Sequence, residues 1–333
     1  MMNEYYPPIT YIVPPEEDGY LLKTILQKRL RVSRKLLSRL KLTEHGIMLN
    51  GERVYISVKV RPGDVVSIQL EQEISEDILP QPMDLDILYE DEALLILNKR
   101  AGVIVHPTHG HYTGTLANGV VHYWAEQGVR YRFRPVHRLD QETSGVLAVA
   151  KNAYVHQHIS EQMIAGQVDK KYAAIVHGRP TPSEGTVDGP IDRDPAEPHR
   201  RIVTPSGYPA LTYYKVVEKY HQGSMVHLKL GSGRTHQIRV HMTWMGCPLI
   251  GDKLYSQAGR GEDEARELQS AGKLDELIDR QALHARELGF VHPLTGEYML
   301  FTAPLPEDME ELRDALRSQS FLSHKNDQIG DKA

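Results

Sequence analysis

The first clear pattern of hydrophobic and polar positions predicts two short amphipathic helices near the start of the chain. Between residues 19 and 43, apolar residues recur at helical spacing in two sets, and Ser33 stands between the sets as an N-cap. The two sets are Leu21, Leu22, Ile25, Leu26 and Leu30, followed by Leu36, Leu37 and Leu40. Downstream, the pair Asn50-Gly51 indicates a hairpin turn, and an alternating strand runs from Val65 to Leu70. We therefore predict a compact module of helices and a small sheet.

The remainder of the chain mixes strand and helix patterns without the regular alternation of a βαβ repeat. Strands are predicted over 93–98, 146–150, 171–177, 210–218, 225–230 and 297–302, and helices over 152–166, 235–245 and 263–280. Such a mixture is typical of an α+β domain with a mixed, largely antiparallel sheet. The expected organisation is an N-terminal extension (1–18), the small α+β module (19–73), a linker (74–84), a large domain (85–308) and a C-terminal tail (309–333).

Composition places the chain among ordinary soluble globular proteins. Of its 333 residues, 40% are hydrophobic and 25% are charged. No run approaches the roughly 20 apolar residues of a membrane helix, and the sequence MMNEYYPPIT lacks the features of a signal peptide. A single cysteine, Cys247, excludes an intramolecular disulfide and a cysteine-based zinc site. We expect a cytoplasmic protein without membrane partners.

The net charge of −5 hides a strong asymmetry along the chain. Residues 23–61 contain eleven lysines and arginines against two glutamates, whereas residues 71–92 contain nine acids and neither lysine nor arginine. A basic block followed by an acidic, proline-containing segment indicates a small polyanion-binding domain and a linker. The alternative is that the basic residues merely form a solvated helix face.

Two further segments carry candidate chemistry. Asp140 stands in a polar, turn-prone loop just before the strand 146–150, where scaffolds often present functional groups. The alternative is a turn aspartate that caps its own backbone. Arg234 and Arg239 follow the turn Gly231-Ser232-Gly233, and an arginine placed against Asp140 would keep that carboxylate ionised and oriented.

Other motifs are less specific. The alternation Arg130-Tyr131-Arg132-Phe133-Arg134 suits a surface that meets phosphates and bases, but it equally suits an amphipathic strand. The histidines of 106–111 are read as a loop near RNA and not as a metal site. Ser144 with His137 and Asp140 is formally a hydrolase set, but no Gly-x-Ser-x-Gly elbow accompanies it.

Several segments of the large domain resemble the RluA family of pseudouridine synthases. The matching motifs are His137-Arg138-Leu139-Asp140 with Thr143-Ser144-Gly145, Asn98-Lys99 with Val105-His106-Pro107, Lys171-Tyr172, Gly233 to His241, and Leu283-His284-Ala285 with Phe301 to Pro306. Arg100 and Ser232 depart from the family pattern, which usually has proline and often threonine there. The resemblance covers about 85–306 and implies the pseudouridine synthase fold.

The small module resembles the S-four-like RNA-binding domain, first described in a ribosomal protein of the small subunit. The matching residues are Ser33-Arg34-Lys35, Gly46 to Gly51 and Val60 to Asp64. Such domains hold structured RNA mainly through its backbone. The residues we expect to contact RNA are Arg29, Arg34, Lys35 and Arg39 in the module, and Arg132 and Arg134 in the large domain.

The RluA resemblance implies conversion of uridine in RNA to pseudouridine, with no cofactor and no metal. Asp140 is the implied catalytic carboxylate, and attack on the sugar, addition to the base and proton removal with glycal formation all stay open as its role. By position, Arg234 is the expected partner of Asp140. Tyr172 is expected to stack on the target uracil, and Arg138 to enter the RNA where the flipped base left.

The resemblance favours large-subunit (23S) ribosomal RNA as the substrate, because RluA-like enzymes with such a front domain mostly act there. Transfer RNA is the alternative substrate. Two alternative functions from other classes are a non-catalytic RNA-binding or ribosome-assembly factor and a metal-dependent hydrolase. We expect a monomer that needs no protein partner.

Overall fold

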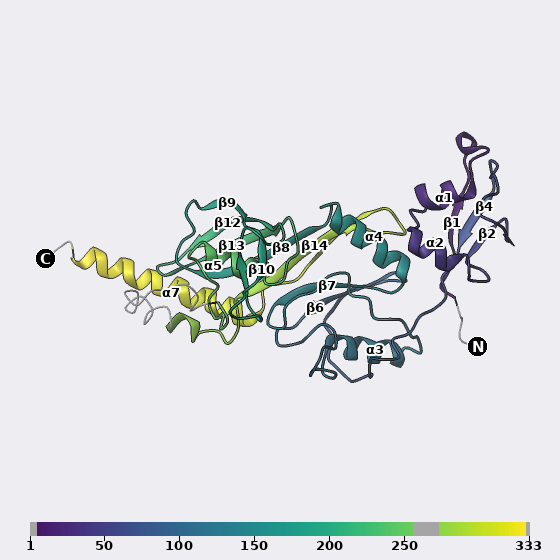
Figure 1. Cartoon of the computed structure of the whole chain (residues 1–333). Helices are drawn as coiled ribbons and strands as arrows, with labels where there is room; N and C mark the ends of the chain where they lie inside the picture. Colours follow the sequence, from purple (N-terminus) through teal and green to yellow (C-terminus); the bar gives the residue numbers. More distant parts are fainter. Residues whose placement is uncertain (1–4, 256–272, 331–333) are drawn as a thin grey trace.

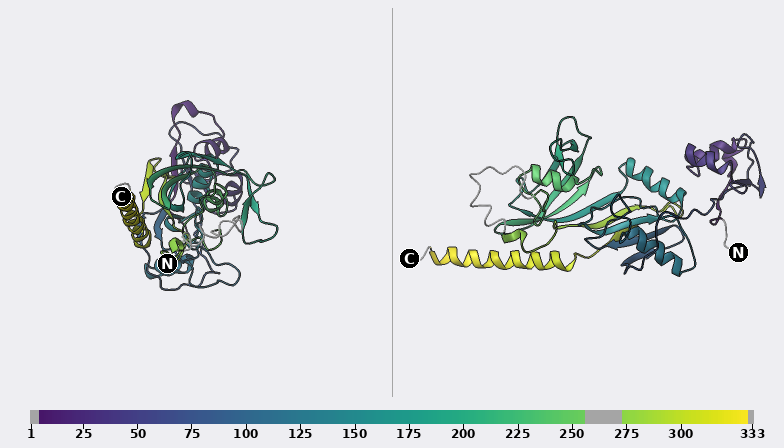
Figure 2. Two further views of the ribbon diagram at one scale, coloured as in Figure 1. Left: turned by 90° about the vertical axis from the view of Figure 1, so that its left-hand side faces the viewer. Right: turned by 60° about the horizontal axis from the view of Figure 1, so that its bottom comes forward.

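The protein has two parts, which lie side by side in an elongated molecule (Figures 1 and 2). The structure is a computed structural model that describes residues 5–255 and 273–330. A small N-terminal domain (residues 5–71) lies at one end, and the last helix of the large domain (residues 85–330) extends from the other end (Figure 1). In this described part, no helix is both long enough and apolar enough to cross a membrane.

The N-terminal domain combines two helices with a four-stranded antiparallel sheet, in the order β1-β4-β2-β3. Its elements are β1 (Ile9–Ile12), η1 (Pro15–Glu17), α1 (Leu22–Lys28), α2 (Arg34–Leu40), β2 (Ile47–Leu49), β3 (Glu52–Arg53) and β4 (Val65–Ile68). Ser33 caps α2, because its hydroxyl accepts a hydrogen bond from the backbone nitrogen of Leu36 at 3.2 Å. Asn50 and Gly51 adopt φ angles of 52° and 83°, the left-handed pair that a tight two-residue hairpin requires. Both helices and the hairpin are confirmed.

The expected N-terminal extension over 1–18 was wrong for most of that segment. Strand β1 pairs along its whole length with β4, from Ile9 opposite Ile68 to Ile12 opposite Val65. The side chain of Glu17 is buried, and its carboxylate accepts from Tyr11 and forms an ion pair with Arg29. Four residues after a proline pair are too short for a periodic signal, so this strand is specified by its partner across the sheet.

The large domain is built on a nine-stranded sheet. Its longest path runs β5-β6-β7-β14-β8-β13-β12-β9, with β15 paired to β14. The strands are β5 (Ile87–Glu90), β6 (Leu94–Lys99), β7 (Ser144–Ala150), β8 (Asp169–His177), β9 (Glu184–Asp188), β12 (Leu211–Lys219), β13 (Gly223–Leu230), β14 (Leu283–Val291) and β15 (Tyr298–Thr302). The pair β7–β14 is parallel and the other pairs are antiparallel. The predicted mixed, largely antiparallel sheet is confirmed.

Helices cover both faces of this sheet. Leu94 and Ile96 of β6 pack into the hydrophobic cluster on the α4 side, whereas Leu95 and Leu97 pack into the cluster that contains α3 and α5. The covering helices are α3 (Leu116–Glu126), α4 (Ala153–Ile164) and α5 (Gln237–Trp244), and a small separate hairpin joins β10 (Ile191–Arg193) to β11 (Arg201–Val203). Burial on both faces explains why β6 and β7 are continuous apolar runs in the sequence.

Residues 309–333 were expected to be a tail, and this was wrong for the described part. Residues 309–330 belong to α7 (Glu307–Gly330), whose first turns bury Met309, Leu312 and Leu316 in a cluster with Ile175 of β8. Much of the predicted helix over 263–280 lies outside the described residues. In its described part, residues 273–275 are helical.

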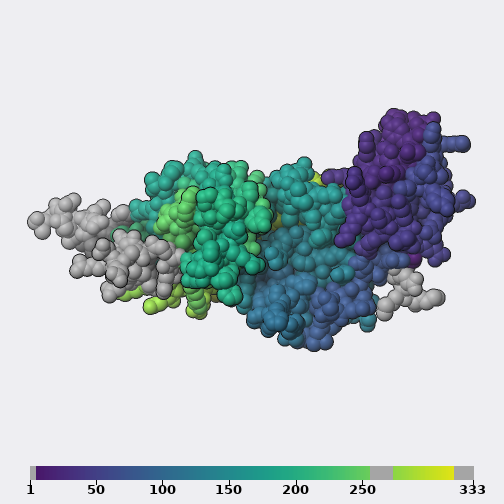
Figure 3. All heavy atoms as spheres, viewed as in Figure 1, coloured from purple at the N-terminus to yellow at the C-terminus, as the bar shows by residue number. Residues whose placement is uncertain are grey.

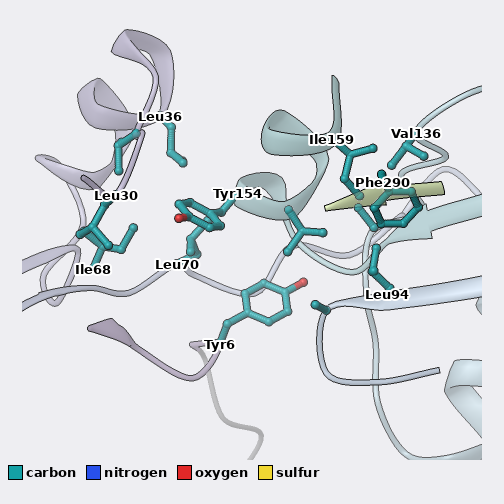
Figure 4. Close-up of a cluster of buried hydrophobic side chains, with 14 of the residues drawn as sticks. Tyr6, Leu30, Leu36, Ile68, Leu70, Leu94, Val136, Tyr154, Ile159 and Phe290 are labelled. Carbon is teal, nitrogen blue, oxygen red and sulfur yellow. The ribbon is translucent and has the colours of Figure 1, made fainter. Parts of the chain in front are cut away.

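One hydrophobic cluster runs through both domains (Figure 4). It contains Leu30, Leu36, Ile68 and Leu70 of the N-terminal domain and Leu94, Val136, Tyr154, Ile159 and Phe290 of the large domain. Tyr6 lies between the two groups, and its hydroxyl donates to the carbonyl of Lys151 at 2.6 Å. The side chain of Gln157 on α4 both donates to the carbonyl of Arg31 and accepts from the backbone nitrogen of Ser33. The two domains therefore pack as one body.

The segment predicted as a linker, 74–84, is bound along the surface of the large domain. Ile78 is buried, the hydroxyl of Ser75 accepts from the backbone nitrogen of Phe133, and Asn118 donates to the carbonyl of Leu79. Its contacts hold the connection between the domains in a defined path.

Candidate active site

Asp140 lies in the loop that leads into β7, on the α5 side of the sheet centre. The backbone nitrogen of Thr143 donates to the carbonyl of Asp140 at 3.1 Å, which closes a turn just before the strand. Gly145 follows with φ of 116°, and a β carbon at that position would lie 2.2 Å from the carbonyl oxygen of Ala285 on β14. Only glycine permits this close approach of two parallel strands directly behind the Asp140 loop.

Two buried basic side chains, Lys99 and Arg280, bind the backbone of the Asp140 loop. The ammonium group of Lys99, at the end of β6, donates to three carbonyl oxygens, including that of Gln141 at 2.9 Å. Burial lowers the pKa of Lys99 to about 7. Arg280 donates to the carbonyl of Glu142 at 3.1 Å and forms a paired contact with Asp308 at the start of α7. The backbone on the C-terminal side of Asp140 is therefore fixed by side chains from distant parts of the chain.

The guanidinium group that meets Asp140 belongs to Arg239. Its Nη1 lies 3.3 Å from Oδ2 of Asp140, while its Nε and Nη2 donate to the two carboxylate oxygens of Asp252 at 2.7 and 2.8 Å. Asp252 is fully buried and also accepts from the backbone nitrogens of Leu254 and Tyr255. Arg239 thus bridges a buried structural carboxylate and a partly exposed one, a bidentate geometry that lysine could not provide.

The prediction that Arg234 pairs with Asp140 was wrong. Arg234 lies before the first turn of α5, where it donates to the carbonyl of Pro209 at 3.1 Å and covers the ring of Tyr208. Arg239 lies within the helix and is buried against the sheet. The sequence placed both arginines next to the same glycine turn, and only the helix register decides which one points inward.

His236 and Tyr172 complete the surroundings of Asp140. Nε2 of His236 lies 3.8 Å from Oδ2 of Asp140, and its other ring nitrogen contacts the hydroxyl of Tyr255 at 2.9 Å. Burial lowers the pKa of His236, with Asp140 acting in the opposite sense. Tyr172 is a buried residue of β8, and burial, followed by the negative charge of Asp140, raises the pKa of its phenol. The phenol therefore stays protonated at neutral pH.

The chain is similar to known RNA pseudouridine synthases. Residues 93–244 match the family model described as RNA pseudouridylate synthase. An uncharacterised RNA pseudouridine synthase of Bacillus subtilis, YlyB, is 43% identical over 81% of this chain and 86% of its own length. The ribosomal large subunit pseudouridine synthase D of Escherichia coli is 38% identical over 81% of each chain. A solved human structure, RNA pseudouridylate synthase domain containing 4, aligns with a TM-score of 0.56 at 26% identity and covers 70% of this chain and 93% of its own.

The chain belongs to the RluA family of RNA pseudouridine synthases. It is therefore an enzyme that acts on RNA. The formal hydrolase set is not assembled: the hydroxyl of Ser144 contacts Nδ1 of His284 at 2.9 Å, whereas His137 accepts from the backbone nitrogen of Ala148. Among the described residues, no three metal-ligating side chains lie close enough together to hold a metal ion.

The residues expected to contact RNA lie in three different settings. Arg138, Arg34 and Lys35 are exposed and make no ion pair within the described part of the chain. Arg29 is paired with Glu17, which neutralises much of its charge. Arg39, Arg132 and Arg134 gather around Glu73 where the two domains meet. The aromatic residues between these arginines turn inward, with Phe133 buried and Tyr131 stacked on Tyr6.

Sequence reasoning missed most of the residues that surround Asp140. Asp252, Tyr255 and Lys99 were assigned no role at the site, although Lys99 was part of a matched motif. One available signal was an arginine flanked by Ile238 and Val240 in a helix, because a charge on a buried helix face requires a partner. The identity of that partner, Asp252, depends on tertiary packing.

Proposed function

We propose that this RluA-family enzyme isomerises specific uridines of large-subunit (23S) ribosomal RNA to pseudouridine. The observation that carries the proposal is the Asp140 carboxylate, which is 27% exposed, bound by the guanidinium of Arg239 and close enough to Tyr172 for its charge to raise the pKa of that phenol. Its relative in Escherichia coli is named for action on the large ribosomal subunit. The reaction breaks the N1–C1′ bond, turns the uracil and joins its carbon 5 to C1′, so no electron or group is gained or lost.

In the proposed reaction, Asp140 is the carboxylate that promotes cleavage of the glycosidic bond. Arg239 supports this role because its positive charge stabilises the ionised carboxylate and its hydrogen bond orients it. Nucleophilic attack on the sugar, addition to the base and proton removal with glycal formation all need this charged form. Tyr172 would stack on the uracil, since a phenol whose pKa is raised is a poor base.

The uridine must leave its helix or loop to reach Asp140, which costs a few kcal/mol (roughly) of lost stacking and pairing. Arg138 is proposed to fill the space that the base leaves, since its guanidinium is exposed and makes no ion pair among the described residues. Arg234, which covers the exposed ring of Tyr208 just before α5, is proposed to contact the substrate backbone. The enzyme is proposed to act in the cytoplasm as a monomer without a protein partner.

The test is tritium release from RNA labelled at carbon 5 of uridine, with unmodified large-subunit rRNA and bulk tRNA assayed separately. We expect release from rRNA by the wild type and none by Asp140→Asn. Glu142→Gln is the matched control, because it makes the same chemical change two residues away in the same loop, and it should retain activity. Release from tRNA alone would refute the rRNA assignment, and no release by a folded, RNA-binding wild type would favour the assembly-factor alternative.

A further inference from the structure

The junction of the two domains contains an open pocket of about 380 Å³ that is distinct from the Asp140 site. The purple N-terminal domain meets the large domain along this boundary in Figure 3. Residues of both domains line the pocket: Lys35 and Arg39 of α2, Glu73, and Arg132, Phe133, Arg134, Pro135 and His156 of the large domain. It thus combines basic side chains that are about 100 residues apart in the sequence.

The pocket holds more positive than negative charge. Four cations, Lys35, Arg39, Arg132 and Arg134, face one carboxylate, that of Glu73. Burial tends to raise the pKa of Glu73, but the surrounding arginines outweigh it and lower the pKa, so this carboxylate is ionised at neutral pH. His156 adds no charge there, because burial and then the nearby charge of Arg134 lower its pKa. The formal charge of the pocket is therefore +3.

The cations divide into two groups by exposure. The side chain of Arg134 is 11% exposed, and its contact with Glu73 joins the large domain to the segment that leaves the N-terminal domain. Arg39 and Arg132 also contact Glu73, but their side chains are 47% and 58% exposed. Lys35 is exposed, one helical turn before Arg39 on the same face of α2, and makes no ion pair within the described residues. Three cations thus keep donors directed to solvent.

We infer that this pocket binds a backbone phosphate of the RNA substrate, held at the same time by Lys35 and Arg39 of one domain and Arg132 of the other. The inference rests on the proposed function, since it names where the same RNA would be held away from Asp140. Glu73 already shows that an anion is accommodated by these guanidinium groups. One carboxylate cannot neutralise four cations, so a phosphate is favoured electrostatically, and guanidinium forks suit its oxygens.

A double-mutant cycle in the full-length protein tests whether one phosphate is shared between domains. Lys35→Gln, Arg132→Gln and the double variant are compared for binding to an unmodified transcript of large-subunit rRNA over a range of salt concentrations. Each single change should weaken binding several-fold and lower the slope of log K against log salt by about 0.7–0.9, the value for one lost phosphate contact. The double variant should bind only slightly more weakly than either single variant, because the shared contact is already lost.

In the matched control cycle, Lys59→Gln is used in place of Lys35→Gln. Lys59 is an exposed lysine of the same domain that does not line the pocket. In the Lys59→Gln and Arg132→Gln cycle the effects should multiply, whether or not Lys59 touches RNA. Independent effects in the Lys35 cycle, or wild-type affinity and salt slope in both single variants, would overturn the inference. Wild-type affinity would leave an acidic protein partner as the occupant of the pocket.

Tritium release by the wild type separates this inference from the proposed function. In the pocket variants, release at subsaturating RNA should fall by the same factor as RNA binding, because Lys35 and Arg132 are assigned to holding the RNA and not to the reaction at Asp140. An inactive wild type would refute the proposed function, while the binding cycle would still decide the shared phosphate. Unfolding in urea should be unchanged in the two single variants, which alter exposed side chains only.

Discussion

Arg239 makes two contacts whose roles can be separated by mutation. Arg239→Gln would leave the carboxylate of Asp252 fully buried without its cation. Removing one partner of a buried ion pair destabilises a protein by about 3–5 kcal/mol, because the remaining charge stays desolvated and unpaired. The double variant Arg239→Gln, Asp252→Asn removes both charges, and the two backbone nitrogens that bind Asp252 can still donate to the asparagine oxygen. We therefore expect the double variant to recover more than half of the lost stability.

Activity should not follow stability in this series. The double variant still lacks the Nη1 group that lies 3.3 Å from Asp140, so its tritium release should stay as low as that of Arg239→Gln. Asp252→Asn alone is the control, since it keeps the contact between Arg239 and Asp140. Urea unfolding measures the stability, and tritium release at a temperature where all variants are folded measures the activity. A double variant with wild-type activity, or one no more stable than Arg239→Gln, would refute the separation of roles.

Three further predictions concern other parts of the molecule. Tyr172→Phe should retain far more tritium release than Tyr172→Leu, because the proposed role requires a stacking ring and not an ionised phenol. Burial lowers the pKa of His284 to about 4. As the pH falls, this histidine therefore binds a proton in the unfolded chain before it does so in the folded protein. The free energy of unfolding should consequently decrease between about pH 6.5 and 4. At about 1.4 kcal/mol per pKa unit this contributes about 3 kcal/mol, and His284→Gln should show a shallower pH dependence in urea unfolding. Ser33→Ala should lower stability by about 1 kcal/mol through loss of the cap on α2, with Ser38→Ala as the exposed control.

Each of these has an outcome that would contradict it. Equal activity of the Phe and Leu variants of Tyr172 would argue against stacking. A wild type and a His284→Gln variant with the same pH dependence would show that His284 does not carry the linkage. An unchanged free energy of unfolding in Ser33→Ala would show that the hydroxyl adds nothing to the helix.

Local signals made the N-terminal helices and hairpin predictable from sequence. Ser33, Asn50 and Gly51 act through their own backbone and nearest neighbours, so their effect is readable without the fold. Strand β1 was missed because four residues carry too little pattern by themselves and depend on β4. Helix α7 was read as a polar tail, although Met309, Leu312 and Leu316 have helical spacing, because three apolar positions among many charges indicate a helix only when a core is there to receive them.

The candidate site around Asp140 likewise has a part that local signals indicate and a part that depends on the fold. Asp140 could be found from its motif and from the turn before a strand, both of which are local. The choice between Arg234 and Arg239 could not, since it depends on which residue begins α5 and therefore on the angle at which each side chain leaves the helix. The role of Asp252 could not be predicted from the sequence, because Asp252 contacts Arg239 only in the folded chain.

The apolar cluster shared by the two domains has a consequence for substrate choice. Since Leu30 and Leu36 pack into the same cluster as Tyr154 and Ile159, the basic face of α2 keeps a constant distance and direction from Asp140. If an RNA stem is held on that face, only a nucleotide at a fixed distance along the stem can reach Asp140. A uridine a few base pairs further along the stem would be out of reach and rotated to the wrong side, whatever its neighbouring bases. The enzyme would thus select its target by the distance between the bound stem and the uridine, as well as by direct contacts with the RNA.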